Sequence, residues 1–209
     1  MDDADVRLAG LAAEASACRI CRESNGNPLP HEPRPVFVAS RAARILIASQ
    51  APGTRAHASG VPFDDRSGDR LRDWLGVSRA EFYDPRNFAI LPMGFCFPGQ
   101  DAKGGDLPPR RECAPRWRAP MLSLMPQIDL ILTIGQYAQA WHMGRDRRGS
   151  LTDTVRDWEA IFAASEGPRV LPLPHPSWRN TGWLKRNPWF EAELLPRLQQ
   201  ETRLRLSAS

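Results

Sequence analysis

The stretch RILIASQAPG, which runs from Arg44 to Gly53, joins an apolar run to a turn of small residues and proline. The run is apolar at every position from Ile45 to Ala48, and such runs are typical of strands buried on both faces of a parallel sheet. In open sheets of that kind, ligands bind beyond the carboxyl ends of the strands. The stretch therefore predicts a central strand and, in the turn after it, part of a binding site.

Three more apolar runs follow along the chain: FAILPMGF at Phe88–Phe95, LILTIG at Leu130–Gly135 and VLPL at Val170–Leu173. Helix-like stretches separate them. These are 68–75 capped by Ser67, part of 113–125, 136–143, a helix from Ser150 to about Ala164, and a last helix with Asn187 as cap and Pro188 at its first position. Strands that alternate with helices predict an α/β fold, a three-layer α/β/α domain with a central four-stranded parallel sheet.

Length and composition narrow the class of protein. The 209 residues fit one domain, residues 1–209, and 42% apolar with 25% charged residues is typical of soluble globular proteins. No apolar run approaches the roughly 18 residues that cross a bilayer, and the acidic start lacks the order of a secretory signal. We expect a cytoplasmic monomer with no membrane partner. The net charge of +4 is a small excess, so the placement of the cations has to show whether the partner is a polyanion.

The four cysteines fall into two groups. Cys18 and Cys21 form a CxxC, and Cys96 and Cys113 form a wider pair. In a cytoplasmic chain such groups hold a metal more often than disulfides. Spacing alone leaves open a structural zinc with four thiolates, an iron-sulfur cluster, and four unrelated thiols, of which Cys96 would be an ordinary core residue.

Several segments together resemble a known family. They are the cysteine pattern, SQAPG at Ser49–Gly53, GVPF at Gly60–Phe63 and HPSWRN at His175–Asn180, in an order that spans Ala17 to about Leu195. The set resembles the iron-sulfur uracil-DNA glycosylases of families four and five. The resemblance implies a uracil-DNA glycosylase-like fold, and a monofunctional repair enzyme that uses water to cut the N-glycosidic bond of a flipped deaminated base, uracil or a related lesion. The alternative is a noncatalytic DNA- or lesion-binding relative that has lost the activity.

The resemblance also assigns the cysteines. By that likeness, a structural four-iron, four-sulfur cluster would be held by Cys18, Cys21, Cys96 and Cys113. Zinc is the alternative metal.

Glycosidic cleavage explains the residue types of the implied site. It leaves a sugar with oxocarbenium character and a base anion, so the site must stabilise both charges and aim a water. By the resemblance, His175 donates to the base oxygen that gathers negative charge, and flanking prolines stiffen its backbone. Phe63 would stack on the extruded base, where without the motif it would be core. Gly53 and Ser177 belong to the same substrate-binding motifs.

The chain departs from the family pattern at two positions. Family four has a Glu where this chain has Gln50, whose amide can position a water molecule but cannot take its proton. Family five lacks that acid too and uses an Asp downstream of the Phe, which points to Asp65, or failing that to Asp69. Either Asp could instead sit at the start of a helix beside Ser67.

The second departure concerns the substrate. At the substrate-binding position where family four has an Asn that reads the uracil edge, this chain has Pro92. Proline offers no hydrogen-bond donor from its side chain or backbone nitrogen. The resemblance therefore implies the reaction more firmly than it implies uracil as the base.

Cations and tryptophans follow the predicted catalytic histidine. By the resemblance, Trp178 or Arg179 would enter the minor groove and fill the space that the flipped nucleotide leaves. Phosphates of the damaged DNA would be contacted by Arg179, Lys185 and Arg186. For each cation the alternative is an ordinary solvated side chain.

A second basic group could extend this DNA track: Lys103, Arg110, Arg111, Arg116 and Arg118. Two further tryptophans, Trp183 and Trp189, are predicted to pack inside the fold. The last helix should bury one face, because its apolar residues recur at four-residue steps: Phe190, Leu194 and Leu198.

Overall fold

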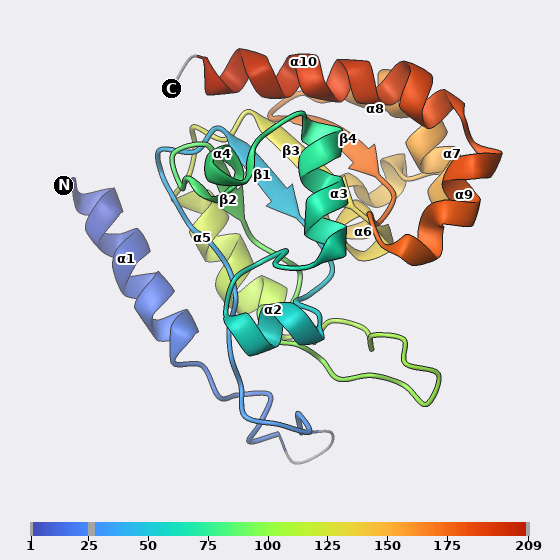
Figure 1. The fold of residues 1–209 in the computed structure, drawn as a ribbon. Helices are drawn as coiled ribbons and strands as arrows, with labels where there is room; N and C mark the ends of the chain where they lie inside the picture. Colours follow the sequence, from blue (N-terminus) through green and yellow to red (C-terminus); the bar gives the residue numbers. More distant parts are fainter. Residues whose placement is uncertain (1, 25–27, 208–209) are drawn as a thin grey trace.

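The computed structural model describes residues 2–24 and 28–207 and contains one four-stranded sheet (Figure 1). The order is β2-β1-β3-β4 with every neighbouring pair parallel, which confirms the predicted fold class. Ile45 lies opposite both Phe88 and Leu130, so the carboxyl ends of the strands meet at one edge. The strands are β1 (Ile45–Ala48), β2 (Phe88–Ile90), β3 (Leu130–Ile134) and β4 (Arg169–Leu173).

Helices cover both faces of the sheet because successive strand residues point to opposite sides. Ile45 and Ile47 pack with α3, α4, α7, α8 and the carboxyl-terminal helix, whereas Leu46 and Ala48 pack with α1, α5 and α6. The helices are α1 (Asp3–Ser16), α2 (Thr54–Ser59), α3 (Arg66–Leu75), α4 (Arg79–Tyr83), α5 (Ala119–Ser123), α6 (Gln136–Met143), α7 (Leu151–Arg156), α8 (Trp158–Ala164), α9 (Thr181–Arg186) and α10 (Leu195–Leu206).

Short irregular turns link several of these helices. A π-helical turn, Ala114–Arg118, leads into α5, and a second one, Phe190–Leu194, leads into α10. Two 3₁₀ turns, Gly144–Asp146 and Trp178–Asn180, follow α6 and precede α9. The region predicted to be helical in part, 113–125, thus contains a π-helical turn followed by a short α-helix.

Two predicted boundaries, the end of β2 and the start of α3, differ from the structure. The strand predicted for 88–95 ends at Ile90, because Pro92 has no N–H for a regular ladder. The Leu91 N–H still donates to Ile47 of β1, and the Met93 and Gly94 N–H groups donate to the chain directly after β1. The predicted cap Ser67 lies inside α3, and Asp65 caps that helix.

The last helical stretch starts directly after Asn187, whose carbonyl accepts from the Phe190 N–H, but the Asn187 side chain does not cap it. Its amide nitrogen donates to the Trp183 carbonyl, and its amide oxygen accepts from Trp189 Nε1. Ser150 does cap α7, and the helix expected to reach Ala164 is interrupted at Asp157.

The carboxyl-terminal packing matches the sequence pattern. The side chains of Phe190, Leu194 and Leu198 are fully buried. Trp183 and Trp189 meet edge to face and pack against the same core, which confirms their structural role. Within the described residues, no helix is long and apolar enough to cross a membrane.

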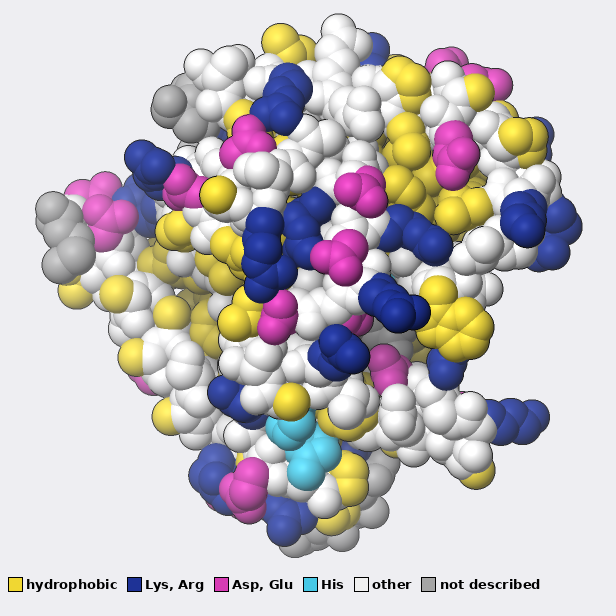
Figure 2. Space-filling view, in the orientation of Figure 1, with side chains coloured by type: hydrophobic (Ala, Val, Ile, Leu, Met, Phe, Trp, Pro, Cys, Tyr) yellow, Lys and Arg dark blue, Asp and Glu magenta, His cyan; other side chains and the backbone are white. Residues whose placement is uncertain are grey.

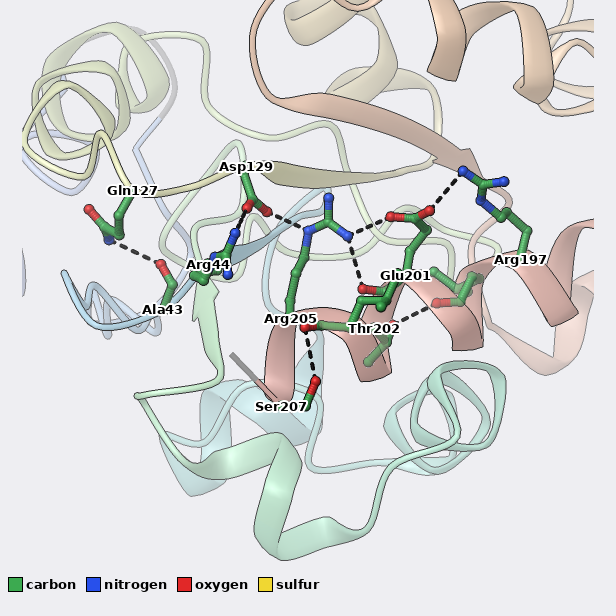
Figure 3. Close-up of polar contacts among 11 residues, drawn as sticks. Ala43, Arg44, Gln127, Asp129, Arg197, Glu201, Thr202, Arg205 and Ser207 are labelled. Atoms are coloured by element: carbon green, nitrogen blue, oxygen red, sulfur yellow. Dashed lines mark hydrogen bonds and ion pairs between the residues drawn. The ribbon is translucent and has the colours of Figure 1, made fainter. Parts of the chain in front are cut away.

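Ion pairs connect the strands and α10 at the amino edge of the sheet. Asp129, just before β3, accepts from Arg44, just before β1, and from Arg205 of α10 (Figure 3). Buried Glu201 pairs with Arg205 and Arg197 on the same helix. This network fixes α10 to the strands at the edge opposite to the predicted site.

Candidate active site

A pocket of about 430 Å³ lies beyond the carboxyl ends of β1, β2 and β4. Its wall combines the segments after these strands with residues of 98–109, a loop that we call the arm. The arm projects from the body of the molecule and is drawn in light green in Figure 1. The volume is in the range of small-molecule sites, and the position is the one that the fold class predicts for a ligand.

His175 enters the pocket directly after β4. Its Nδ1 accepts a hydrogen bond of 3.2 Å from the Ser177 backbone N–H, so the neutral ring carries its proton on Nε2. The amide of Asn180 donates to the His175 carbonyl at 2.7 Å and fixes the turn. Burial lowers the pKa of His175, while the charges of Asp65 and Asp106 oppose that shift. The pocket therefore contains a neutral histidine whose Nε2–H is available as a donor.

Phe63 lines the same pocket with a strained backbone. Its φ of 54° is positive, and such outliers persist where the surrounding structure enforces them. Gly68 permits this conformation, because a Cβ there would lie 1.8 Å from the Phe63 carbonyl oxygen. The Tyr83 Oη lies 3.1 Å from that oxygen and from the Pro62 carbonyl oxygen. The ring also packs edge to face on Phe82, so Phe63 belongs to both the core and the pocket.

The two candidate acids after Phe63 differ in placement. Asp65 lines the pocket, and its Oδ1 accepts the Gly68 N–H at 2.9 Å as the cap of α3. Asp69 is exposed and pairs with Arg72, which is buried against Phe82 and Tyr83. The structure therefore brings Asp65 to His175 and leaves Asp69 in a supporting contact.

Gln50, predicted to position a water molecule, is not among the described residues that line the pocket. Ser49 and Ala51 line the pocket on either side of it. The Gln50 Nε2 donates to the Leu107 carbonyl of the arm at 3.0 Å. Its amide thus contacts the arm rather than the space where a substrate would lie.

Sequence reasoning missed a carboxylate of this pocket. Asp106, on the arm, lines the pocket, and its Oδ1 accepts from Gln100 Nε2 at 3.2 Å. Its Oδ2 stands close above Gly53, where a Cβ would lie 3.5 Å from it. Asp106 sits in a Gly-Gly-Asp turn that is typical of a surface loop, so no local pattern marks it as a site residue.

Comparison with known families identifies the kind of fold that carries this pocket. Residues 35–199 match the model of the uracil DNA glycosylase superfamily. The chain belongs to this superfamily. Its members are generally DNA glycosylases that act on DNA, and the three-layer parallel fold seen here is consistent with theirs.

The other predicted substrate-binding residues lie in the same pocket. Gly53, Pro92 and Ser177 all line it. Trp178 lies at its mouth, 69% exposed, beside the Arg179 guanidinium. The pocket has two further arginines that the sequence did not reveal, Arg55 of α2 and Arg66 of α3. Figure 2 shows basic side chains, with acidic ones among them, across this face of the molecule.

The remaining predicted DNA contacts are spread out. Lys185 and Arg186 lie exposed on α9 and are not among the described residues that line the pocket. Arg179 lines the pocket and donates to the Gly104 carbonyl of the arm at 2.8 Å. Arg70 of α3 donates to the Ser177 carbonyl, which ties that helix to the turn after His175.

One member of the second basic group cannot contact DNA. Arg118 is fully buried, donates to the Leu91 carbonyl and contacts His142. Its prediction as a cation of the DNA track is wrong, because spacing along the chain does not show that its side chain points inward. Burial lowers the pKa of Arg118 to about 10. Arg110 contacts the Pro28 carbonyl, and the exposed members are Lys103, Arg111 and Arg116.

The four cysteines line one small apolar hollow, with Leu29, Phe95 and Trp117 among its walls. All four are free thiols. The Phe95 N–H donates to Cys113 Sγ at 3.2 Å and Trp117 Nε1 to Cys18 Sγ at 3.3 Å.

The hollow is lined by four thiols, two of which accept N–H contacts, and both features are typical of thiolate-bound metals. Burial raises the pKa of Cys96 and of Cys113 to about 12, so a bound cation would have to displace their protons. Across residues 2–24 and 28–207, no three Cys, His, Asp or Glu side chains form a group that could hold a metal ion. The superfamily match begins after Cys18 and Cys21 and includes Cys96 and Cys113.

Proposed function

We propose that this chain is a monofunctional DNA glycosylase that hydrolyses the N-glycosidic bond of a flipped, deaminated base, uracil or a related lesion. The observation that carries the proposal is the neutral His175 with its proton on Nε2, in one pocket with an aromatic ring and acidic groups. Superfamily membership supplies the reaction class.

The leaving base is the part of the reaction that His175 serves. A base rotated out of the duplex would enter the pocket and lie against Phe63. The Nε2–H of His175 would donate to the base oxygen on which negative charge collects as the bond breaks. A preorganised donor of this kind is worth about 10²–10³-fold in rate.

The sugar carries the opposite charge. Asp65 lies in the same pocket and is close enough to His175 for its charge to affect the ring. A carboxylate there would stabilise the oxocarbenium character of the sugar and help to orient the attacking water. No covalent intermediate with the enzyme is required.

The pocket mouth supplies the DNA contacts of the proposal. Trp178 is large, apolar and exposed, as a side chain that fills a vacated base position must be. Arg55, Arg66 and Arg179 line the same mouth and would pair with phosphates on either side of the flipped nucleotide.

Pro92 bears on which base is cut. It lines the pocket without offering a donor to a base edge. The proposed substrates are therefore uracil, hypoxanthine and xanthine in DNA rather than uracil alone. The same observation, with Gln50 turned to the arm, also fits a noncatalytic lesion-binding relative, which the experiment below distinguishes.

We also propose that Cys18, Cys21, Cys96 and Cys113 hold a structural four-iron, four-sulfur cluster, with zinc as the alternative. The support is their shared apolar hollow and the two N–H donors to sulfur. The cluster would join the amino-terminal segment to the segments after β2. Brown colour, visible absorbance and an iron-to-sulfide ratio near one are expected, and a colourless protein with bound zinc would contradict the cluster.

The test of the main proposal is an alkali strand-cleavage assay on single- and double-stranded oligonucleotides that contain uracil, hypoxanthine or xanthine. The wild type should leave an abasic site at one or more of these bases, and His175→Ala and Asp65→Ala should slow the reaction. Asp64→Asn is the matched control, because Asp64 pairs with Arg79 and is not among the described residues lining the pocket. No abasic site from any base, together with tight lesion binding that both variants leave unchanged, would support the noncatalytic alternative.

A further inference from the structure

The arm is a compact hairpin rather than a loose loop. The Leu107 N–H donates to the Gly99 carbonyl at 2.9 Å, and the Asp101 N–H donates to the Gly105 carbonyl at 2.8 Å. Gln100 and Asp106 form an antiparallel bridge, and their side chains are hydrogen-bonded. The position of Asp106 is therefore set by the hairpin as a whole.

Two contacts hold this hairpin against the pocket. Gln50, directly after β1, donates to the Leu107 carbonyl, one residue beyond Asp106. Arg179, directly after the His175 turn, donates to the Gly104 carbonyl, two residues before it. The loop after β1 and the loop after β4 thus each donate a hydrogen bond to the arm, one on either side of Asp106.

The carboxylate of Asp106 is available for chemistry. Its Oδ1 bonds to a neutral amide, and its Oδ2 stands close above Gly53. Among the described residues no Lys or Arg forms an ion pair with it, whereas Asp64 and Asp69 nearby are each paired with an arginine. A carboxylate that no neighbouring cation neutralises can interact with a reacting group instead.

We propose that Asp106 is the water-activating carboxylate of this pocket and that Gln50 is the positioning residue that holds it there. The proposal rests on the glycosylase function proposed above. It explains why no acid is needed at position 50: the amide of Gln50 places an acid from elsewhere in the chain.

Depth in the pocket separates the roles of the two carboxylates. A flipped base enters first and its sugar stays near the mouth, joined to the backbone. Asp106 is exposed at the rim, where the sugar carbon and solvent water meet, whereas Asp65 is half-buried and one of its oxygens caps α3. Asp65 then supplies charge to the site, and Asp106 takes the proton.

The chemical step balances without a further reagent. The bond between C1′ and the base nitrogen breaks, its electron pair leaves with the base, and His175 Nε2–H donates to the base oxygen that gathers the charge. A lone pair of water forms the new bond to C1′, and Asp106 takes the proton that the water loses. The base anion is then protonated by solvent.

The first experiment measures single-turnover rates on the best substrate of the wild type, with enzyme in excess, for Asp106→Asn, Asp65→Asn and the control Asp64→Asn. A general base contributes about 10²–10⁴-fold, so Asp106→Asn should be slower than the wild type by about 100-fold or more. Its affinity for DNA with a stable abasic analogue should stay within about 3-fold, and Asp64→Asn should match the wild type.

The second experiment tests Gln50 as a positioning residue. Gln50→Glu adds an acid but cannot donate to the Leu107 carbonyl, so we expect it to be slowed about 10- to 100-fold, like Gln50→Leu. Gln199→Leu is the control, since Gln199 of α10 also donates to a backbone carbonyl, that of Asp73. The double variant Gln50→Leu/Asp106→Asn should be no slower than Asp106→Asn, because Gln50 acts through Asp106.

The outcomes separate this inference from the proposed function. If the wild type cuts no base, the function fails and this role fails with it. If the wild type is active and Asp106→Asn stays within about 3-fold of it, or Gln50→Glu is faster, only the assignment of Asp106 and Gln50 fails. A denaturation-resistant protein–DNA adduct that Asp106→Asn abolishes would overturn water activation in favour of direct attack.

An NMR titration of His175 checks the geometry without any turnover. Because the charge of Asp106 opposes the lowering of the His175 pKa, Asp106→Asn should lower that pKa further. An unchanged His175 titration would show that the arm does not hold Asp106 at the pocket, and would overturn the inference.

Discussion

The two edges of the sheet use carboxylates in opposite ways. At the amino edge, Asp129 accepts from two arginines and Glu201 lies buried between two more ion-pair contacts. At the carboxyl edge, Asp65 and Asp106 accept from a backbone N–H and a neutral amide, and neither has an ion pair within the described residues. Paired acids fix an element in place, and acids left without a cation are placed for a ligand.

The largest effect on stability that this comparison predicts is at the amino edge. Glu201→Ala should lower the free energy of unfolding by about 2–3 kcal/mol, because it removes the buried carboxylate that pairs with both Arg205 and Arg197, while Arg205 keeps its pair with Asp129. Urea denaturation measures this loss. Glu191→Ala, an exposed acid in the preceding π-helical turn, is the control and should stay within about 0.5 kcal/mol.

The same variant should leave the chemistry alone. Below its unfolding temperature, Glu201→Ala should cleave at the rate of the wild type, since the network lies at the edge opposite the pocket. A slowed single-turnover rate in the fully folded variant would break the division between the two edges.

The reciprocal experiment is at His175. His175→Ala should slow cleavage by about 10²–10³-fold, which corresponds to about 3–4 kcal/mol in the barrier. Its free energy of unfolding should change by less than about 1 kcal/mol, because the ring borders an open pocket rather than the core. A large loss of stability with little loss of rate would make His175 a structural histidine.

A second histidine shows what burial away from the pocket does. His142 lies against the buried Arg118, and burial together with that positive charge lowers the pKa of His142 to about 3. In the unfolded chain this histidine has an ordinary pKa of about 6.5, so between pH 6.5 and pH 3 it binds a proton in the unfolded state but not in the folded state. Stability contributed by neutral His142 is therefore complete above pH 6.5 and falls as the pH drops from 6.5 toward 3.

His142→Gln isolates this contribution. Glutamine stays neutral at every pH, so the variant should lose less stability than the wild type between pH 7 and pH 5. The carboxyl groups of Glu81 and Asp84, whose pKa values are lowered to about 2 by their hydrogen bonds, remain ionised over that range. If the free energy of unfolding, measured by urea denaturation, falls equally with pH in the variant and the wild type, the prediction is wrong.

The sequence predicted much of the fold because buried runs mark strands directly. It did less well at element ends: Ser and Asp are both residue types that cap helices, and only the structure shows that Asp65, not Ser67, caps α3 by accepting the Gly68 N–H. The strand at Phe88 is shorter than predicted, because apolar residues continue past Pro92 whereas the regular hydrogen-bond ladder stops at Ile90.

The site divides in the same way. His175, Phe63 and Asp65 lie in local motifs and were predicted, and the pocket contains all three. Asp106 and the partner of Gln50 depend on a contact between residues 57 apart, which no local pattern encodes. Arg118 shows the converse, since a cation that looked like a surface residue is fully buried.

The smallest predicted effect concerns the support of Phe63. Tyr83→Phe removes a hydroxyl that lies 3.1 Å from the Phe63 carbonyl, and should lower the free energy of unfolding by about 0.5–1.5 kcal/mol. Because the same hydroxyl bonds to the Pro62 and Phe63 carbonyls, its loss should loosen the pocket wall on which we propose that the base stacks, and KM should rise more than kcat falls. A variant with the same loss of stability but unchanged KM would show that Gly68 and Phe82 hold the ring without Tyr83, and that the strain at Phe63 is set by packing alone.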